Sequence, residues 1–113
     1  MRMMNLSEVL SLVNRKVEEL LEKYPSLRLV SFKHWRTNSI YRKYHIEATF
    51  KLDEPEKLIR HNVKLILPNI GFDIDIDYAT DEEILELVET LFLRLDHYVY
   101  WILRSLNRDP LVV

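Results

Sequence analysis

The feature that most constrains the fold is a long amphipathic stretch near the C-terminus, residues 80–106. Its apolar residues recur every three or four positions, which is the period of an α-helix. Thr80 and Glu83 form a predicted capping box at its start, and the acidic residues beside them favour the positive end of the helix dipole. Such a helix is about 40 Å long, whereas a six-residue strand covers about 20 Å. A small sheet therefore cannot cover the whole helix.

A second helix and two strands are predicted in the N-terminal half of the chain. Residues 5–24 carry an apolar stripe at helical spacing, with Asn5 as a cap and Pro25 as the stop. Residues 27–35 read as a strand, although their apolar side chains fall on both faces. Residues 40–52 alternate most clearly, and the two strands form a predicted hairpin. The residues of the second strand that we expect to point inward are Tyr44, Ile46, Ala48, Phe50 and Leu52.

The middle of the chain is ambiguous, because residues 54–67 fit either a helix or a strand. We favour a helix, since Asp53 can cap it and Pro55 suits its first turn. Pro68 then supplies a stop. Residues 72–78 alternate as a further strand, and those expected to point inward are Phe72, Ile74, Ile76 and Tyr78.

These patterns predict one α+β domain, residues 1–113, with the element order α-β-β-α-β-α. The expected architecture is a small, mostly antiparallel sheet with the helices packed on one face and a long C-terminal helix. The sheet has three strands, or four if residues 54–67 are extended.

Composition excludes several classes of site. The chain has no cysteine, so it forms no disulfide and no thiolate metal site. Its single glycine, Gly71, excludes glycine-rich phosphate loops, and we expect no cofactor. The charged, glutamine-free composition leans towards a thermophilic source. Neither a signal peptide nor an apolar run of about 18 residues is evident, so we expect a cytoplasmic protein without a membrane partner.

The first candidate site is the row formed by Asp73, Asp75 and Asp77, which alternate along the last predicted strand. Alternate strand residues lie about 6.6 Å apart, whereas oxygen ligands must converge to about 2.1–2.5 Å from an ion. A metal-dependent enzyme that uses Asp73 and Asp75 is therefore the weakest alternative. We favour a solvated face on which the aspartates pair across strands. The candidate partners are Lys43, His45 and Lys51.

The second candidate site is the predicted hairpin, residues 32–45, in which basic and aromatic side chains alternate. Basic groups neutralise phosphates and aromatic faces stack on bases, so this pattern suits RNA or DNA. The alternative is a solvated face with some of the aromatic residues in the core. The candidate nucleic-acid-binding residues are Lys33, His34, Trp35, Arg36, Tyr41, Arg42 and Lys43.

The third candidate site is the C-terminal half of the last helix, which extends past the reach of a small sheet. Its apolar residues need another cover, and a two-fold homodimer is the commonest solution. The N-terminal helix or a different protein partner are the alternatives. The candidate interface residues are Leu91, Leu95, Tyr98, Trp101 and Ile102.

Two short resemblances accompany these patterns. Residues 46–50 (IEATF) and 79–85 (ATDEEIL) are similar to pieces of the small dimerising subunit of the KEOPS tRNA-modification complex. That family places a strand hairpin between its two helices, and residues 68–72 leave no room for one. The opening helix and hairpin, with Arg60–His61, resemble the BolA family, but the following span is shorter and the last helix longer. Neither resemblance assigns the chain to a family.

The sequence favours a small, non-enzymatic interaction or adaptor protein that homodimerises through its C-terminal helix. A nucleic-acid-binding protein that uses the hairpin is the main alternative.

Overall fold

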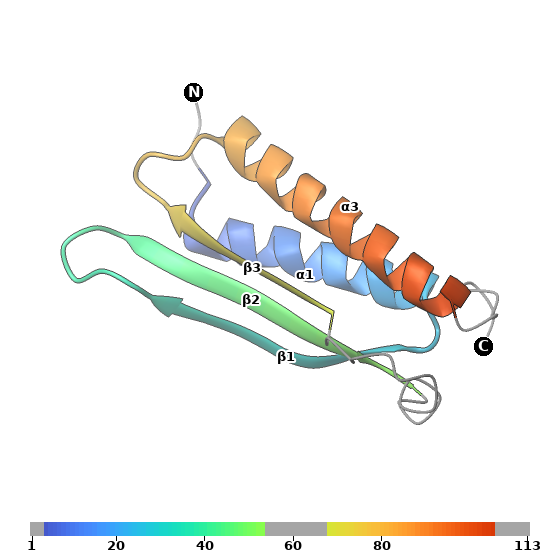
Figure 1. The fold of residues 1–113 in the computed structure, drawn as a ribbon. Coiled ribbons are helices and arrows are strands. Elements are labelled where there is room, and N and C mark those ends of the chain that lie inside the picture. The colour runs from blue at the N-terminus through green and yellow to red at the C-terminus, as the bar shows by residue number, and fades with distance from the viewer. Residues whose placement is uncertain (1–3, 54–67, 106–113) are drawn as a thin grey trace.

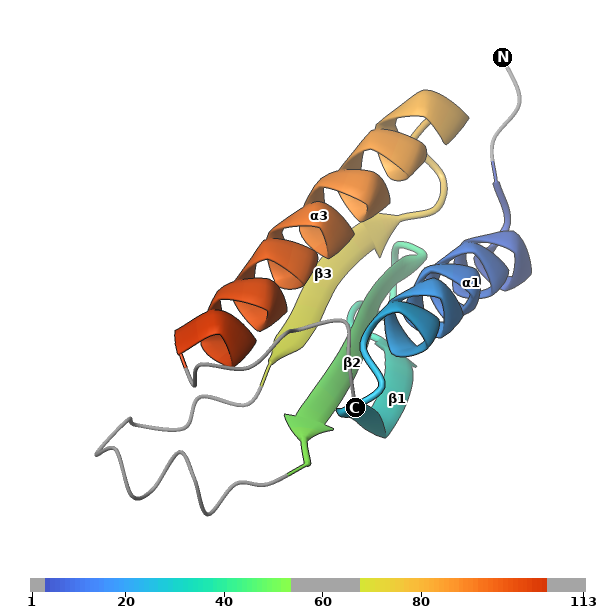
Figure 2. The same ribbon diagram turned by 90° about the vertical axis from the view of Figure 1, so that its right-hand side faces the viewer.

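The computed structural model describes residues 4–53 and 68–105. The elements are α1 (Leu6–Lys23), β1 (Leu27–Arg36), β2 (Lys43–Leu52), β3 (Asn69–Asp75) and α3 (Asp81–Ser105) (Figure 1). The three strands form one antiparallel sheet in the order β1-β2-β3. Both helices lie on the same face of this sheet, as Figures 1 and 2 show. The predicted α+β class and the long C-terminal helix are confirmed, while the helix predicted at residues 54–67 lies outside the described residues.

The two helices run in the same direction. β1 and β3 are both antiparallel to β2, so they are parallel to each other. Residues 24–26 turn the chain from α1 back into β1, and residues 76–80 turn it from β3 back into α3. Each helix is therefore antiparallel to the strand that neighbours it in the sequence, and the two helices begin at the same end of the sheet (Figure 1).

The limits of α1 follow from its cap and its stop. The backbone N–H of Glu8 donates to Asn5 Oδ1 at 2.8 Å, and the Glu8 carboxylate accepts from the backbone N–H of Asn5 at 3.5 Å. This reciprocal pair is the predicted capping box. At the other end the N–H of Tyr24 donates to the carbonyl of Leu20 at 3.0 Å, and Pro25 follows. The prediction of this helix is confirmed.

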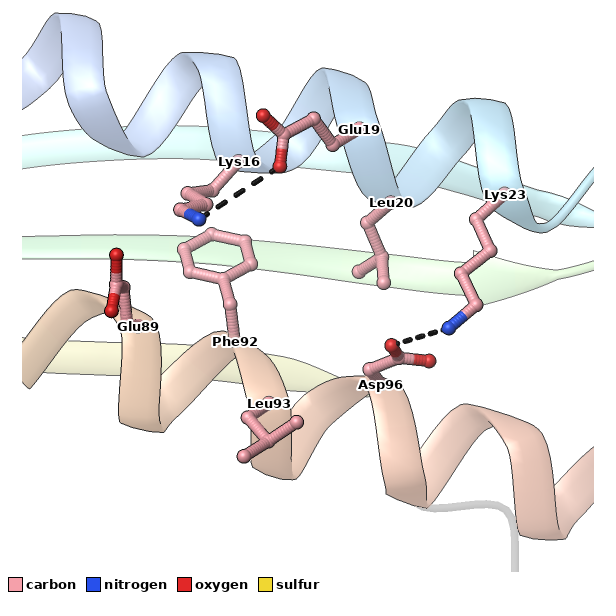
Figure 3. Close-up of a pocket in the computed structure, with 8 residues that line it drawn as sticks. All are labelled: Lys16, Glu19, Leu20, Lys23, Glu89, Phe92, Leu93 and Asp96. Carbon is pink, nitrogen blue, oxygen red and sulfur yellow. Dashed lines mark hydrogen bonds and ion pairs between the residues drawn. The ribbon is translucent and has the colours of Figure 1, made fainter.

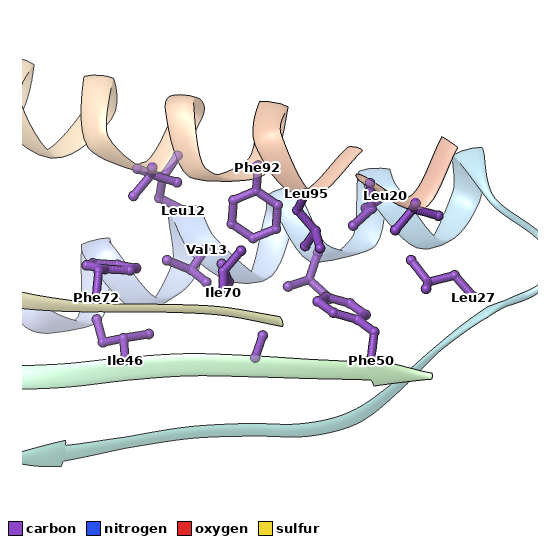
Figure 4. Packing of buried hydrophobic residues seen from close by; sticks show 14 of the residues in the cluster. Leu12, Val13, Leu20, Leu27, Ile46, Phe50, Ile70, Phe72, Phe92 and Leu95 are labelled. Atoms are coloured by element: carbon purple, nitrogen blue, oxygen red, sulfur yellow. The ribbon is translucent and has the colours of Figure 1, made fainter. Parts of the chain in front are cut away.

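The core lies between the sheet and the two helices (Figure 4). β2 supplies it as the alternation predicted, because Ile46, Ala48 and Phe50 are fully buried and Leu52 is nearly so. Tyr44 is half-buried against the same cluster. The other hydrophobic side chains of the buried cluster are Val9, Leu12, Val13, Val17 and Leu20 of α1, Tyr24, Leu27 of β1, Ile70, Phe72 and Ile74 of β3, Ile76, and Ile84, Val88, Phe92, Leu95, Val99 and Leu103 of α3.

The second strand begins later than the alternation predicted. It starts at Lys43 rather than Ile40, and residues 37–42 form the loop of the hairpin. The side-chain oxygen of Asn38 accepts the backbone N–H groups of Ile40 and Tyr41 at 2.8 and 3.0 Å. These bonds hold a local turn that competes with strand pairing, which leaves Ile40 79% exposed.

The last strand is displaced from its predicted position towards the N-terminus. It covers Asn69–Asp75, and the chain then turns because the carbonyl of Asp75 accepts the N–H groups of Tyr78 and Ala79 at 3.3 and 3.0 Å. Ile76 is buried as predicted, but the prediction that Tyr78 points inward is wrong, since its side chain is 69% exposed. Within residues 4–53 and 68–105, neither helix is long and apolar enough to cross a membrane.

Candidate interaction surfaces

The face of the sheet opposite the helices is uncovered within the described part of the chain (Figure 1). Antiparallel partners point to the same face, so the pairing register determines which side chains lie there. Trp35 is opposite His45, and His45 is opposite Asp73 on the third strand. We call this surface the bare face. Its central residues are Lys33 and Trp35 of β1, Lys43, His45 and Glu47 of β2, and Gly71, Asp73 and Asp75 of β3.

His45 contacts side chains of all three strands on the bare face. Its Nδ1 lies 2.8 Å from Asp73 Oδ1 and its Nε2 lies 3.3 Å from Glu47 Oε2. The Trp35 ring lies against the imidazole, with the two centroids 4.7 Å apart. The hydrogen bond to Asp73 is the main cause that raises the pKa of His45 above its ordinary value. Burial opposes this rise, and the weaker hydrogen bond to Glu47 adds to it. The site thus stabilises an imidazolium between two carboxylates.

Gly71 lies beside His45. A methyl group at Gly71 would lie 3.5 Å from both Cε1 and Nε2 of His45, which is ordinary van der Waals contact. Glu47 is the cross-strand partner of Gly71. The imidazole of His45 therefore lies beside the chain's single glycine, and an alanine at this position would contact it without a clash.

The three aspartates are used in three different ways. Asp73 pairs with His45, one of the partners that the sequence suggested. Asp77 accepts a bond from Arg42 Nε at 2.9 Å, and this hydrogen bond is the main cause that lowers the pKa of Asp77. Asp75 accepts the backbone N–H of Asp77 at 3.1 Å and lies opposite Lys43 in the register. Among the described residues, no three His, Asp or Glu side chains are grouped so that they could hold a metal ion.

The hairpin residues proposed for nucleic acid are divided by the structure. Lys33, Trp35 and Lys43 gather on the bare face, whereas the register places His34 and Arg36 on the helix side of the sheet. Arg36 donates to the backbone carbonyls of Asn38 and Tyr41 at 2.8 and 3.4 Å, so it supports the hairpin loop. Arg42 is paired with Asp77, and Tyr41 is exposed in the loop. The sequence missed both arginine contacts, because they depend on loop geometry and on a strand distant in sequence.

The residues proposed for a dimer interface are also divided. Leu95 belongs to the core of the chain, and Leu91 and Ile102 are half-buried against that core. Tyr98 and Trp101 are exposed, Trp101 by 66%. A residue that the sequence reasoning missed, Leu87, is exposed on the same side, and its four-residue spacing from Leu91 is the signal that identifies it. We call this surface the α3 flank, and its members are Leu87, Leu91, Arg94, Tyr98 and Trp101.

The α3 flank lies next to the β3 edge of the sheet. A hollow of about 360 Å³ is lined by residues of both. Its lining combines backbone and side chains of the sheet edge with apolar helix residues. The lining residues are Asn69, Ile70, Gly71, Leu91, Arg94, Leu95 and Tyr98.

The opposite side of α3 faces α1 across a narrow cleft of about 240 Å³ (Figure 3). Lys23 Nζ lies 2.7 Å from Asp96 Oδ2, and the hydroxyl of the buried Tyr24 donates to the same carboxylate. Burial is the main cause that raises the pKa of Tyr24, and the bond to Asp96 adds to it. Phe92 lies in the wall of this cleft. α1 therefore covers this side of α3. Trp101 lies at the border between this side and the α3 flank, because it lines a further hollow of about 430 Å³ together with Tyr24 and Leu93.

The fold thus presents two distinct surfaces, the bare face and the α3 flank. Comparisons with protein-family models, with curated proteins and with solved structures find no match to this chain.

Proposed function

We propose that this chain is a non-enzymatic interaction protein that forms a homodimer through the α3 flank and acts as an adaptor. The observation that carries the proposal is the second apolar stripe of α3. One side of the helix packs into the core, while the α3 flank displays Leu87, Tyr98 and Trp101 to solvent. Arg94 is the only charged member of this stripe.

The physical argument is that exposed apolar stripes of this kind mark interfaces. Monomeric soluble proteins rarely leave contiguous apolar patches of more than a few hundred Å² in water. Tyr98 and Trp101 are of the types most enriched among interface hot spots, and they sit on a rigid helix that is anchored in the core. The members of the α3 flank are spaced four, three, four and three residues apart, the spacing with which two helices pack along a seam. A second copy across a two-fold axis supplies the same stripe.

The test replaces Trp101 by glutamate, which places a charge at the C-terminal end of the proposed contact. We expect light scattering at about 100 μM to show a larger mass for the parent than for Trp101→Glu, because an unpaired buried charge costs several kcal/mol of association through the α3 flank. Leu85→Glu is the matched control. Leu85 is an exposed leucine of the same helix whose position lies away from the α3 flank, so this variant should keep the parental mass. A monomeric parent refutes the proposal.

A second candidate function, nucleic-acid binding, is favoured by one observation on the bare face. Trp35 is 46% exposed there, and Lys33 and Lys43 lie on the same uncovered face. An aromatic side chain that can stack on a base, flanked by ammonium groups, is typical of single-strand binding. Glu47, Asp73 and Asp75 on the same face oppose it, which is why we place it second.

The corresponding experiment measures the salt dependence of binding to single-stranded RNA or DNA. The double variant Lys33→Ala/Lys43→Ala should weaken binding and reduce the log–log salt slope by about one for each phosphate that a lysine no longer neutralises. The matched control, Arg15→Ala/Lys16→Ala, removes the same charge from α1 and should keep the parental slope. A parent that does not bind detectably at about 50 mM salt ends this hypothesis.

A further inference from the structure

The outer edge of β1 is a second, chemically distinct feature. Within the described residues, β1 pairs with β2 alone. The N–H of Thr37 donates to the carbonyl of Lys43 at 2.9 Å, so these two residues form a hydrogen-bonded pair of the antiparallel strands. This pair shows which residues of β1 hydrogen-bond to β2. Backbone groups of alternate residues point to opposite sides of a strand, so Lys33 and Trp35 direct theirs to β2. The backbone groups that point outward belong to Phe32, His34 and Arg36.

This edge is also the least covered part of the sheet. β2 and β3 bury every second side chain, whereas of the ten residues of β1 only Leu27 is buried. Val30 is 53% exposed at a register shift between Leu29 and Ser31. Such a bulge interrupts the edge and limits regular pairing to the part that follows it. The segment available to a partner strand is therefore 31–36, which we call the β1 edge.

We propose that the β1 edge pairs antiparallel with the β1 edge of a second copy of this chain, with the two-fold axis at His34. In this register Lys33 lies opposite Trp35 of the second copy, on the bare face. On the helix side, Phe32 lies opposite Arg36 of the second copy. The axis repeats both pairs, so each edge cation lies opposite an aromatic residue, a pairing that attracts through the ring quadrupole. Lys33 and Trp35 form the stronger pair, because the Arg36 guanidinium already donates to carbonyls of the hairpin loop.

The neighbouring registers are less favourable. An axis at Lys33 places two lysines opposite each other, and like charges in direct opposition destabilise a sheet. An axis at Trp35 places His34 opposite Arg36 and leaves Lys33 without an aromatic partner. All three registers pair outward-pointing backbone groups with each other, which antiparallel hydrogen bonding requires, so the side chains decide between them. This self-complementarity is the reason that the proposed occupant is a second copy.

The other edge of the sheet is less open to such pairing. At β3, Leu91, Arg94 and Tyr98 of α3 line the hollow beside Asn69 and Gly71, so an incoming strand would meet the helix there. The β1 edge lies across the sheet from α3 (Figure 2). It is therefore separate from the α3 flank, and the inference does not depend on the proposed function.

Disulfide trapping tests the pairing and its register, because the parent chain has no cysteine. In the proposed register the two His34 Cα atoms are about 5.5 Å apart, which is within the range of about 4.4–6.8 Å that a disulfide spans. His34→Cys should therefore form a covalent dimer on mild oxidation. Lys33→Cys and Trp35→Cys should each fail to do so alone but cross-link to each other when mixed. Glu18→Cys, on the exposed side of α1, is the control for random collision.

The cysteine variants are made both in the parent and in the Trp101→Glu background. Cross-linking of His34→Cys in both backgrounds, faster than that of Glu18→Cys, supports the inference even if light scattering shows that the α3 flank does not dimerise. No cross-link beyond the Glu18→Cys rate in either background overturns it and leaves the α3 proposal standing. Self-cross-linking of Lys33→Cys or of Trp35→Cys overturns the register. In the proposed register each of these residues is displaced by two residues along the strand from the same residue of the second copy, so the two identical cysteines would not meet.

Discussion

At the residue scale, His45 shows what alternation can and cannot predict. The period of two predicted that His45 and the aspartates face away from the core, because the direction of a side chain in a strand is a local property. It could not predict that Asp73, rather than Asp75, meets His45. That choice depends on the register between β2 and β3, which are separated by residues 53–68 of the chain. The Trp35 contact depends in the same way on the register with β1.

The His45–Asp73 pair makes stability depend on pH in a defined direction. The folded pKa of His45 is raised, so its contribution is fully present below the unfolded value of about 6.5 and is lost as pH rises through the folded pKa. Asp73→Asn should lower the pKa of His45, as measured by NMR titration of its ring protons. Asp75→Asn is the matched control and should leave that titration unchanged. Identical His45 titrations in the parent and Asp73→Asn would contradict this account.

At the element scale, the sequence was most informative where local signals agreed. α1 has a cap, a stripe and a stop, and β2 has an unbroken alternation of inward residues. The errors occur at turns where a polar side chain competes with the strand. The Asn38 side chain delays the start of β2 until after Tyr41, and the Asp75 side chain and carbonyl hold the turn that ends β3 before Tyr78. Apolar residues are present in both turns, so periodicity alone could not locate the strand ends.

The capping box of α1 predicts a measurable loss. Asn5→Ala removes the side-chain acceptor of the Glu8 N–H, and we expect it to lower the free energy of unfolding by about 0.5–2 kcal/mol. Urea denaturation followed by circular dichroism measures the change. Asn14→Ala is the control, since Asn14 is exposed within α1 and only bonds to Glu18 on the same helix. An equal loss for both variants would show that the cap is not the cause.

At the scale of the whole molecule, the sequence indicated that a small sheet cannot cover α3. The structure assigns α1 to one side of α3 and leaves the α3 flank exposed. The sequence placed Leu95 on the wrong side of this division, because a helix with apolar residues around much of its circumference does not show which stripe faces the sheet.

The proposed dimerisation through the α3 flank would link the stability of the chain to protein concentration. If the folded state is a dimer, the Tm of the parent rises with protein concentration. Only folded chains associate, so a higher concentration shifts the equilibrium from unfolded chains to the folded dimer. Trp101→Glu should weaken this dependence, whereas Leu85→Glu should keep it. Calorimetric scans over a hundredfold range of concentration make the comparison. A parental Tm that does not change with concentration would contradict a linked dimer.

The common direction of α1 and α3 has a mechanical consequence. The first turn of α1 and the last turn of α3 lie at opposite ends of the fold (Figure 1). A force that separates these two points pulls the helices past each other along their length. The contacts that join them to each other and to the sheet are then loaded together, in shear, rather than opened one after another as in a zipper. Tyr24 and Lys23, which bond Asp96 across the two helices, lie in the path of that load.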